Sequence, residues 1–388
     1  MDFALDAKGE AFRAEVRQFI AENVTAGMVH RAWATGTLHD WDLWRALGRR
    51  RWIAPDWPAA DGGEGRDIFE VAAMREEFGL ADAPVDGWYT TLLVANTIRS
   101  VGSERMKTDI LPRVLAGDVV ACLGFSEPEN GSDAAAARLR AERDGDEWVL
   151  NGQKIFTTLA QVATHVFILA RSNPAAPKHH GLTTFLVPMD APGITIQPIA
   201  TLGGEVTNVT FYSDVRIPDS ARVGEADGGW GVMRVAFTFE RLGGGGGSLR
   251  RLRGIADSYV RSAADDSGRP LIADPSVRER LTSIAMDAEI AHLFGSRSFA
   301  NFAAGTLSHV HTSTSKLFSS EAFQRATRDA LDILGEAATL QSGFGQVPAG
   351  GEIEHQWRHA QVATIYGGSS EVQREILAGQ RLGLPRGR

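Results

Sequence analysis

The chain has 388 residues, 43% of them hydrophobic and 23% charged, and a formal net charge of −8. This length exceeds one compact core and the composition is typical of soluble globular proteins, so we expect two or three domains. The acidic balance without a basic stripe argues against nucleic acid as a partner, and no apolar run approaches the ~20 residues that span a membrane. The N-terminal residues lack a signal-peptide pattern, and a single cysteine, Cys122, fits a reducing compartment, so a cytoplasmic protein is predicted.

The first third of the sequence is predicted to be helical. Its first apolar residues repeat with the spacing of one face of an amphipathic helix: Phe12, Val16, Phe19 and Ile20. Prolines and glycines between residues 55 and 63 indicate a loop. Further helices are predicted over 69–78, 91–101 and 110–115. We expect an N-terminal helical domain over residues 1–118.

From about residue 119 the period changes from helical to alternating, which favours strands. Asp144-Gly145 and Asn151-Gly152 are two-residue hairpin signals between strand-like runs. Later strands are predicted over 166–170, 184–187, 194–196 and 209–212. Short strands at this spacing are typical of a small barrel or sandwich, so we expect a middle β-barrel domain over residues 119–225.

After residue 229 the helical period returns. Asp274-Pro275 is a helix start, because aspartate caps well and proline suits the first helical position. An apolar face follows at Val277, Leu281, Ile284, Ala288 and Ala291. Further helices are predicted over 318–334 and 371–382. We expect a C-terminal four-helix bundle over residues 226–388 and a multidomain α+β fold overall.

Two polar, glycine-bearing segments flank the first hairpin pattern: Ser126–Asp133 and Asn151–Thr158. They offer hydroxyls, backbone N–H groups and one aromatic face to a flat, phosphate-bearing ligand. Glycine lets a backbone approach such a ligand closely, and successive N–H groups form a concave anion site. Asn-Gly-Ser-Asp alone is an ordinary turn. The pair of segments, in this order and spacing, is the more specific signal.

This pair resembles the flavin-binding stretch of the acyl-CoA dehydrogenase family. The resemblance extends along nearly the full chain: helices, β region and bundle follow in the family's order, and residues 211–218, 371–374 and 382–385 resemble further family segments. It implies the acyl-CoA dehydrogenase fold, FAD as the cofactor and an acyl-CoA as the substrate. No metal site is expected.

The resemblance assigns the flavin contacts residue by residue. It places Leu123, Phe125 and Ser126 along the ring, Gly131 and Ser132 at the pyrophosphate, Phe156 stacked on the flavin, Thr158 at the ring's reactive part, and Ser369 and Glu371 as further cofactor contacts. Phe156 stands where a tryptophan is usual. Periodicity alone would favour Phe156 as a barrel core residue, whereas the surrounding Gln-Lys-x-Phe-x-Thr frame favours stacking.

The resemblance also implies a carboxylate base that removes the α-proton of the thioester. Burial in an apolar cleft raises the pKa of such a base toward the working pH. Most family members carry it in a Tyr-Glu-Gly-like turn, where this chain has Gly367. A minority carry it before an arginine on an earlier helix, which predicts Glu240 as the base and Arg241 as a substrate contact. The alternative is a solvated Glu-Arg pair, although Glu240 follows an apolar run.

Five consecutive glycines, Gly243–Gly247, follow this pair. Inside a helix each would cost ~1 kcal/mol relative to alanine, which argues against a neutral filler. One hypothesis is that the missing side chains widen the acyl cavity for a bulky or branched substrate. A kinked or unwound segment is the competing interpretation.

In homomeric family members a neighbouring subunit completes each flavin site with an arginine, a glutamine and a glycine. The matching positions here hold Ala264, Asp332 and Glu336, and carboxylates beside a pyrophosphate are electrostatically adverse. Arg269 could replace the arginine through a shifted alignment. The pattern resembles the FAD- and base-carrying subunit of bacterial α2β2 acyl-CoA dehydrogenases that act on sterol side chains, which predicts a paralogous partner. The alternative is a homomer whose binding site for the adenine end of FAD differs from that of its relatives.

The predicted function is therefore α,β-desaturation of an acyl-CoA, bulky or branched and sterol-derived, with electrons passed to an electron-transfer flavoprotein. A flavin oxidase or monooxygenase acting on a carrier-bound biosynthetic intermediate is the first alternative. A non-catalytic subunit whose partner does the chemistry is the second. The presence of Ser126, Ser132, Thr158 and Glu240 disfavours this last interpretation.

Overall fold

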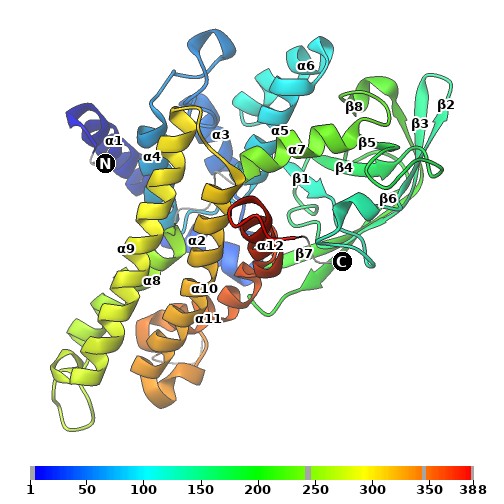
Figure 1. The fold of residues 1–388 in the computed structure, drawn as a ribbon. Coiled ribbons are helices and arrows are strands. Elements are labelled where there is room, and N and C mark those ends of the chain that lie inside the picture. The colour runs from blue at the N-terminus through cyan, green and yellow to red at the C-terminus, as the bar shows by residue number, and fades with distance from the viewer. Residues whose placement is uncertain (1–4, 241–245, 343–346, 386–388) are drawn as a thin grey trace.

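The computed structural model describes residues 5–240, 246–342 and 347–385 and contains helical, β and helical regions in the predicted order (Figure 1). The N-terminal region consists of α1 (Ala7–Asn23), α2 (Ala26–Thr35), α3 (Trp41–Arg49), α4 (Ile68–Leu80), α5 (Gly87–Val101) and α6 (Glu104–Leu115). Side-chain caps fix several of the helix starts. Asp6 accepts a 2.8 Å hydrogen bond from the Gly9 N–H, and Asp67 and Glu70 form a capping box on α4.

Buried tryptophans organise the core of this region. Trp44 and Trp88 are almost fully buried, and each indole N–H finds a backbone carbonyl, of Val119 at 3.2 Å and of Ile53 at 2.7 Å. Large aromatic rings supply much apolar area, and the satisfied N–H groups avoid the cost of a buried unpaired donor.

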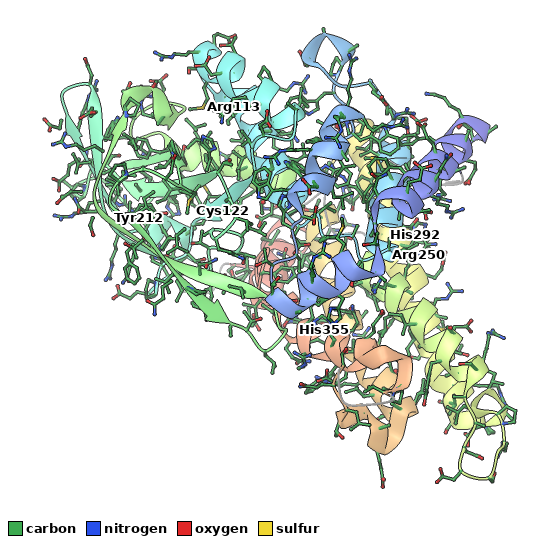
Figure 2. The ribbon with its side chains drawn as sticks, turned by 180° about the vertical axis from the view of Figure 1, so that it is seen from behind. Arg113, Cys122, Tyr212, Arg250, His292 and His355 are labelled. Carbon is green, nitrogen blue, oxygen red and sulfur yellow. The ribbon has the colours of Figure 1, made fainter. Side chains whose placement is uncertain are left out.

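The middle region is a mixed sheet of β1 (Ala121–Gly124), β2 (Arg140–Asp144), β3 (Glu147–Lys154), β4 (His165–Arg171), β5 (Leu182–Pro188), β6 (Ile194–Ala200), β7 (Val206–Pro218) and β8 (Arg222–Val223). The strand order is β6-β7-β3-β2-β4-β5-β8, and β1 pairs in parallel with β4. One face of the sheet covers an apolar core that includes Cys122 and Tyr212 (Figure 2). The other face packs on α5 and α7.

One hairpin prediction is confirmed and one is wrong. Asp144 and Gly145 lead into the turn between β2 and β3, whereas Asn151 and Gly152 lie inside β3. There the register against β7 shifts between Leu150 and Gly152, which marks a bulge. Gly152 has a φ of 141°, and a Cβ on it would lie 3.0 Å from the Leu139 Cα. Close backbone approach explains this glycine better than a turn does.

The C-terminal region holds α7 (Gly229–Glu240), α8 (Gly247–Ser262), α9 (Pro275–Ala303), α10 (His309–Leu334), α11 (Glu352–Ala363) and α12 (Ser370–Gln380). Asp274 caps α9 and Pro275 is its first residue, as predicted. α10 ends before Gly335 as predicted but begins earlier, at His309, and α12 ends at Gln380 rather than at residue 382.

The bundle is formed by α8 to α11 around one apolar core, with α12 packed on α10. α7 lies apart from the bundle and packs on α5 and β5, between the N-terminal helices and the sheet (Figure 1). The predicted boundaries at residues 118 and 225 fall between α6 and β1 and between β8 and α7. Their status as domain boundaries stays a prediction.

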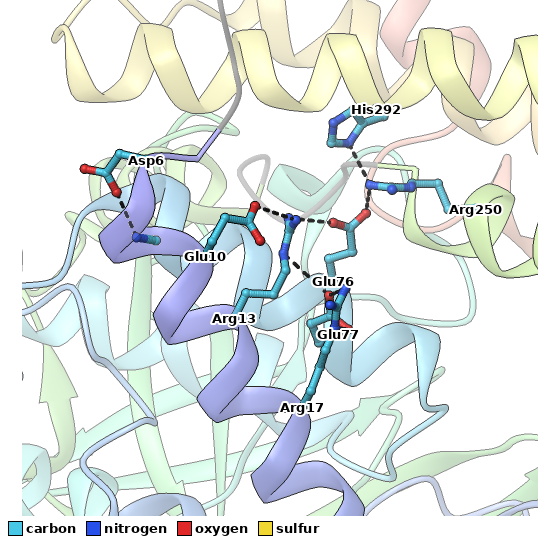
Figure 3. Close-up of polar contacts among 9 residues, drawn as sticks. Asp6, Glu10, Arg13, Arg17, Glu76, Glu77, Arg250 and His292 are labelled. Atoms are coloured by element: carbon cyan, nitrogen blue, oxygen red, sulfur yellow. Dashed lines mark hydrogen bonds and ion pairs between the residues drawn. The ribbon is translucent and has the colours of Figure 1, made fainter.

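Ion pairs connect the N-terminal helices to the bundle (Figure 3). The Glu76 carboxylate on α4 pairs with Arg13 of α1 at 3.5 Å and with Arg250 of α8. The Arg250 guanidinium also donates to Nδ1 of His292 on α9, at 3.3 Å. Burial and the charge of Arg250 lower the pKa of His292, which suits a neutral acceptor.

Within the bundle, α11 is tied to the turn between β6 and β7. His355 donates to the Gly203 carbonyl at 2.7 Å, and Arg358 donates to the Leu202 carbonyl at 2.8 Å (Figure 2). Within the described ranges, no helix is both long and apolar enough to cross a membrane.

Candidate active site

The two polar segments predicted to bind the flavin meet at the end of the sheet. The Ile155 N–H donates to the Ser126 carbonyl at 2.9 Å. Lys154 is fully buried, and its ammonium group donates to the Glu127 carboxylate at 2.7 Å. Each partner of such a buried ion pair needs the other, because removing one would leave the remaining charge buried without a counter-ion.

Glu127 also organises the first segment itself. Its carboxylate accepts from the backbone N–H groups of Arg138 at 2.8 Å and Leu139 at 2.9 Å, and from the Asn130 amide at 3.1 Å. Burial alone would raise the pKa of Glu127, but Lys154 and these donors outweigh it and lower the pKa. Sequence reasoning missed both Glu127 and Lys154, although they lie inside the quoted motifs.

The predicted ring and pyrophosphate contacts follow β1. Leu123, Phe125 and Ser126 are half-buried, whereas Gly131 and Ser132 are exposed. A Cβ placed on Gly131 would meet no atom within 4 Å, so this backbone faces open space. The Phe125 ring lies 6.2 Å from the Phe237 ring of α7, which connects this segment to the helix that carries Glu240.

Phe156 is not a barrel core residue. Its ring is 63% exposed and its φ is 57°, a left-handed conformation that is unusual for an aromatic residue. Thr158, two residues later, is exposed, and its hydroxyl lies 3.0 Å from the Thr207 hydroxyl. Strained backbone that presents an exposed ring is a common feature of ligand sites.

These features fit FAD. The exposed Phe156 ring offers an apolar face to a flat ring system, and Thr158 and Ser132 offer accessible hydroxyls. The open space at Gly131 leaves room for a phosphate group. Beside Thr158, the buried Asn208 Oδ1 makes no hydrogen bond among the described residues.

The structure places Ser369 and Glu371 on a separate element, at the start of α12. The Ser369 hydroxyl accepts from the Val372 N–H at 3.4 Å as the helix cap, and Glu371 is exposed in the first turn. The neighbouring Ser370 hydroxyl and Gln373 Oε1 are buried without a hydrogen bond in the described part of the chain. The structure brings together the predicted flavin contacts of the β region, whereas these two residues belong to the helix packed on α10.

Glu240 is the last residue of α7 and is half-buried. The Tyr89 hydroxyl of α5 donates to its backbone carbonyl. Arg241 and residues 243–245 lie outside the described residues. Gly246 has a φ of 76°, and a Cβ on it would lie 2.7 Å from the Ala291 Cβ. Helices α7 and α8 therefore do not continue through Gly246 as one helix.

A lysine that sequence reasoning missed lies next to the glutamate position of most relatives. Lys316 of α10 donates to the Ala363 carbonyl at 2.6 Å, and its Nζ lies 5.6 Å from the centroid of the Tyr366 ring. A Cβ on Gly367 would lie 3.8 Å from the Lys316 Cε. Burial lowers the pKa of Lys316 to about 8, while the charge of Glu240 opposes that decrease. Lys316 is thus a cation within electrostatic range of Glu240.

Large apolar side chains of this region are unusually exposed. Tyr89 is 41% exposed, Tyr366 52% and Ile365 66%. Exposed aromatic surface beside a half-buried acid is typical of a ligand cleft or an interface.

Most residues at the positions where homomeric relatives complete a neighbour's flavin site contact other residues of this chain. Asp332 pairs with Arg280 at 2.7 Å, and Ala264 bridges Pro270 across the turn between α8 and α9. Arg269 donates to the Ala273 carbonyl at 2.6 Å. Glu336 lies in the short 3₁₀ segment after α10, Gly335–Thr339.

Comparison with known proteins agrees with this geometry. The chain matches the N-terminal, middle and C-terminal domain models of acyl-CoA dehydrogenases over residues 6–118, 122–215 and 227–382. It is 34% identical to acyl-CoA dehydrogenase FadE26 of Mycobacterium tuberculosis, with 97% of each chain covered.

Two solved structures are similar over their full length. The Tcur3481-Tcur3483 steroid ACAD is 32% identical with a TM-score of 0.92, and the ChsE4-ChsE5 complex of Mycobacterium tuberculosis is 32% identical with a TM-score of 0.91; each comparison covers 100% of both chains. The chain belongs to the acyl-CoA dehydrogenase family of FAD-dependent oxidoreductases.

Proposed function

We propose that this protein catalyses the α,β-desaturation of an acyl-CoA thioester with Glu240 as the base. The observation that carries the proposal is the proximity of a half-buried acid and a half-buried cation at one place in the fold. Glu240 ends α7 within electrostatic range of Lys316. Gly367, which occupies the position of the base in most relatives, has no side chain.

In this proposal the β region holds the cofactor and α7 holds the base. Leu123, Phe125, Ser126, Gly131, Ser132, Phe156, Thr158, Ser369 and Glu371 are the proposed FAD contacts. Bound FAD supplies the acceptor for the hydride that leaves the β-carbon. Glu240 takes the proton from the α-carbon, and Arg241 contacts the substrate. The Phe125 and Phe237 rings lie 6.2 Å apart beside the helix that ends at Glu240, and apolar surroundings of this kind strengthen the electrostatic interactions of a base.

We further propose a paralogous partner subunit and a bulky, sterol-derived acyl group. The similar structures are a steroid ACAD and a two-component complex, which supports both parts. An apolar stripe on α9 offers a contact surface: Met286 is 59% exposed, Ile290 37% and Leu293 45%, at helical spacing along one face. An electron-transfer flavoprotein is the proposed electron acceptor.

Co-expression of the chain with a paralogue encoded beside its gene, followed by flavin quantitation and turnover of steroid-side-chain CoA thioesters, tests the proposal. Glu240→Gln is expected to abolish turnover while FAD remains bound, because the isosteric amide cannot accept the α-proton. Glu225→Gln is the matched control, since that carboxylate is 95% exposed before α7. Full FAD occupancy by a homotetramer of the chain alone would contradict the partner. Rapid peroxide formation in air would favour an oxidase instead.

A further inference from the structure

We propose that Asn208 of β7 is a positioning residue for the flavin: its side chain holds the turn that presents Phe156 and Thr158 to the cofactor. This inference rests on the proposed function, because it takes those two residues as FAD contacts. It deepens that proposal by naming the group that fixes the shape of the contact surface. Asn208 acts on the cofactor only through the turn.

The turn that follows β3 has a backbone that needs support from outside. Phe156 and Leu159 have φ values of 57° and 69°, in the left-handed region that residues other than glycine rarely adopt. Thr157 and Leu159 are buried, whereas the two proposed flavin contacts beside them are exposed. A backbone in such conformations persists only where surrounding contacts hold it. The buried residues therefore mark where the turn is held.

Asn208 binds the turn at two points. Its backbone carbonyl accepts from the Thr157 N–H at 2.9 Å, and its side-chain amide donates to the Thr157 carbonyl at 3.0 Å. One residue thus binds both backbone polar groups of Thr157. Asn208 is fully buried, so water does not compete for these hydrogen bonds. Because Thr157 lies between Phe156 and Thr158, this contact fixes the direction in which each of them projects.

A hydrogen-bond network fixes the Asn208 amide itself. The amide also donates to the Gln161 side-chain oxygen at 2.7 Å, and the Gln161 amide nitrogen donates to the Thr37 hydroxyl at 3.1 Å. A carbonyl oxygen can only accept, so the contact with Thr157 determines which end of the Asn208 amide is the nitrogen. Thr37 lies in the connection between α2 and α3. The N-terminal helical region therefore helps to hold the flavin turn.

The neighbouring residue of β7 orients the Thr158 hydroxyl. The Thr207 and Thr158 hydroxyl oxygens lie 3.0 Å apart. Thr207 is buried and Thr158 is exposed, so one hydroxyl is fixed in the strand while the other stays accessible to a ligand. Adjacent residues of one strand thus hold both the backbone of the turn and its accessible hydroxyl. Loss of the Asn208 amide disturbs both, because Thr158 directly follows the residue that the amide binds.

The position of the turn matters most for reduced FAD. Hydrogen bonds to an acceptor that carries charge are roughly twice as strong as those to a neutral one. Reduction makes the flavin ring richer in electrons, so a donor held at its reactive part favours the reduced form. A displaced turn should therefore weaken the binding of reduced FAD more than that of oxidised FAD, which lowers the midpoint potential.

Asn208→Asp tests the inference, because it keeps the shape of the side chain and removes both hydrogen bonds that the amide donates. In the FAD-bound enzyme with its partner, the Kd of FAD is expected to rise about tenfold or more. The two-electron midpoint potential should fall by about 30 mV, which corresponds to a tenfold difference between the two oxidation states. Hydrogen exchange of the Thr157 and Thr158 N–H groups should accelerate about tenfold.

Asn23→Asp is the matched control. The Asn23 amide on α1 also donates to a backbone carbonyl, that of Phe19 at 2.8 Å, and its change should leave the Kd, the potential and the exchange unchanged. If the aspartate variant does not fold, Asn208→Thr replaces it, because a β-branched side chain suits a strand and is one atom shorter than the amide. The same three effects are expected in that variant.

Phe156→Ala separates this inference from the flavin contacts on which it rests. A weaker Kd in Phe156→Ala, together with an unchanged Kd and potential in the Asn208 variants, would overturn the positioning role alone. An unchanged Kd in Phe156→Ala would contradict the proposed contact and the inference with it. Reduced stability of an Asn208 variant at an unchanged potential would also overturn the inference, because that is the signature of a purely structural residue.

Discussion

Lys154 and Glu127 form a buried ion pair with a distance of 2.7 Å between the ammonium nitrogen and the carboxylate oxygen, and this pair joins the two segments that we assign to FAD. Lys154 is fully buried and Glu127 is 6% exposed. The pair therefore couples the stability of the β region to the shape of the cofactor site.

Lys154→Met is expected to lower the free energy of unfolding by about 3–5 kcal/mol, because it leaves the Glu127 carboxylate buried without its cation. FAD retention should fall as well. Without Lys154 the Glu127 carboxylate is no longer fixed in place, and its hydrogen bonds from the backbone N–H groups of Arg138 and Leu139 are weakened. Urea denaturation and flavin content measure the two effects. Arg216→Met removes an exposed partner of Asp144 in the same sheet and should change neither. Equal behaviour of the two variants would contradict the organising role of the pair.

Lys316 is expected to set the pH range in which the base works. The groups that face its ammonium are Glu240, Glu321 and the Tyr366 ring. Lys316→Met removes a positive charge near Glu240 and so favours the protonated, inactive carboxyl group. The acidic limb of the kcat/KM profile should therefore move to higher pH by about one unit.

Lys316→Arg is the matched control for that measurement, because it keeps the charge and should keep the acidic limb in place. In the wild type, Lys316 loses its proton as the pH rises through about 8, so its support of the ionised base is complete only below that value. A uniform loss of activity at every pH in Lys316→Met would indicate a purely structural lysine.

The order of elements and most of the site could be predicted from the sequence because both depend on local patterns. Apolar periodicity and the cap at Asp274-Pro275 are local, and so are the two polar segments. The hairpin signal at Asn151-Gly152 failed because pairing with β7 and close contact with Leu139 outweigh the intrinsic turn preference.

Lys316 could not be found in the same way. It belongs to an ordinary helix, α10, and carries no motif, and its environment is created by the end of α11, which is distant in sequence. Tertiary contacts, rather than residue type, make Lys316 noteworthy.

The Gly367 position offers a test of where the base can act. Glu240→Ala is expected to lose turnover, and the double variant Glu240→Ala/Gly367→Glu is expected to recover at least about tenfold over it, because a carboxylate at residue 367 would lie beside the Lys316 cation. Gly367 has a φ of 64°, so glutamate there carries about 1 kcal/mol of backbone strain. Gly367→Gln in the same background is the control and should recover nothing. Recovery by both would rule out a chemical role for the new carboxylate.

The His359–Glu205 pair predicts a pH window for stability. Burial alone would raise the pKa of Glu205, but the bond and charge of His359 lower it to about 2, so its contribution is present above the unfolded value of about 4.3 and is lost as pH falls through 2. Burial alone would lower the pKa of His359, but Glu205 raises it, so that contribution is complete below about 6.5 and is lost at higher pH.

Both contributions coincide between about pH 4.3 and 6.5. Glu205→Gln should therefore reduce the free energy of unfolding by about 1–2 kcal/mol near pH 5.5, and by less at an alkaline pH above the raised pKa of His359, where the imidazole is neutral. Urea denaturation at the two pH values measures the difference. Glu225→Gln, at the exposed carboxylate before α7, should change it at neither. A loss in Glu205→Gln that is the same at both pH values would mean that the carboxylate acts by packing and by its hydrogen bond to a neutral imidazole, rather than through the charge of His359.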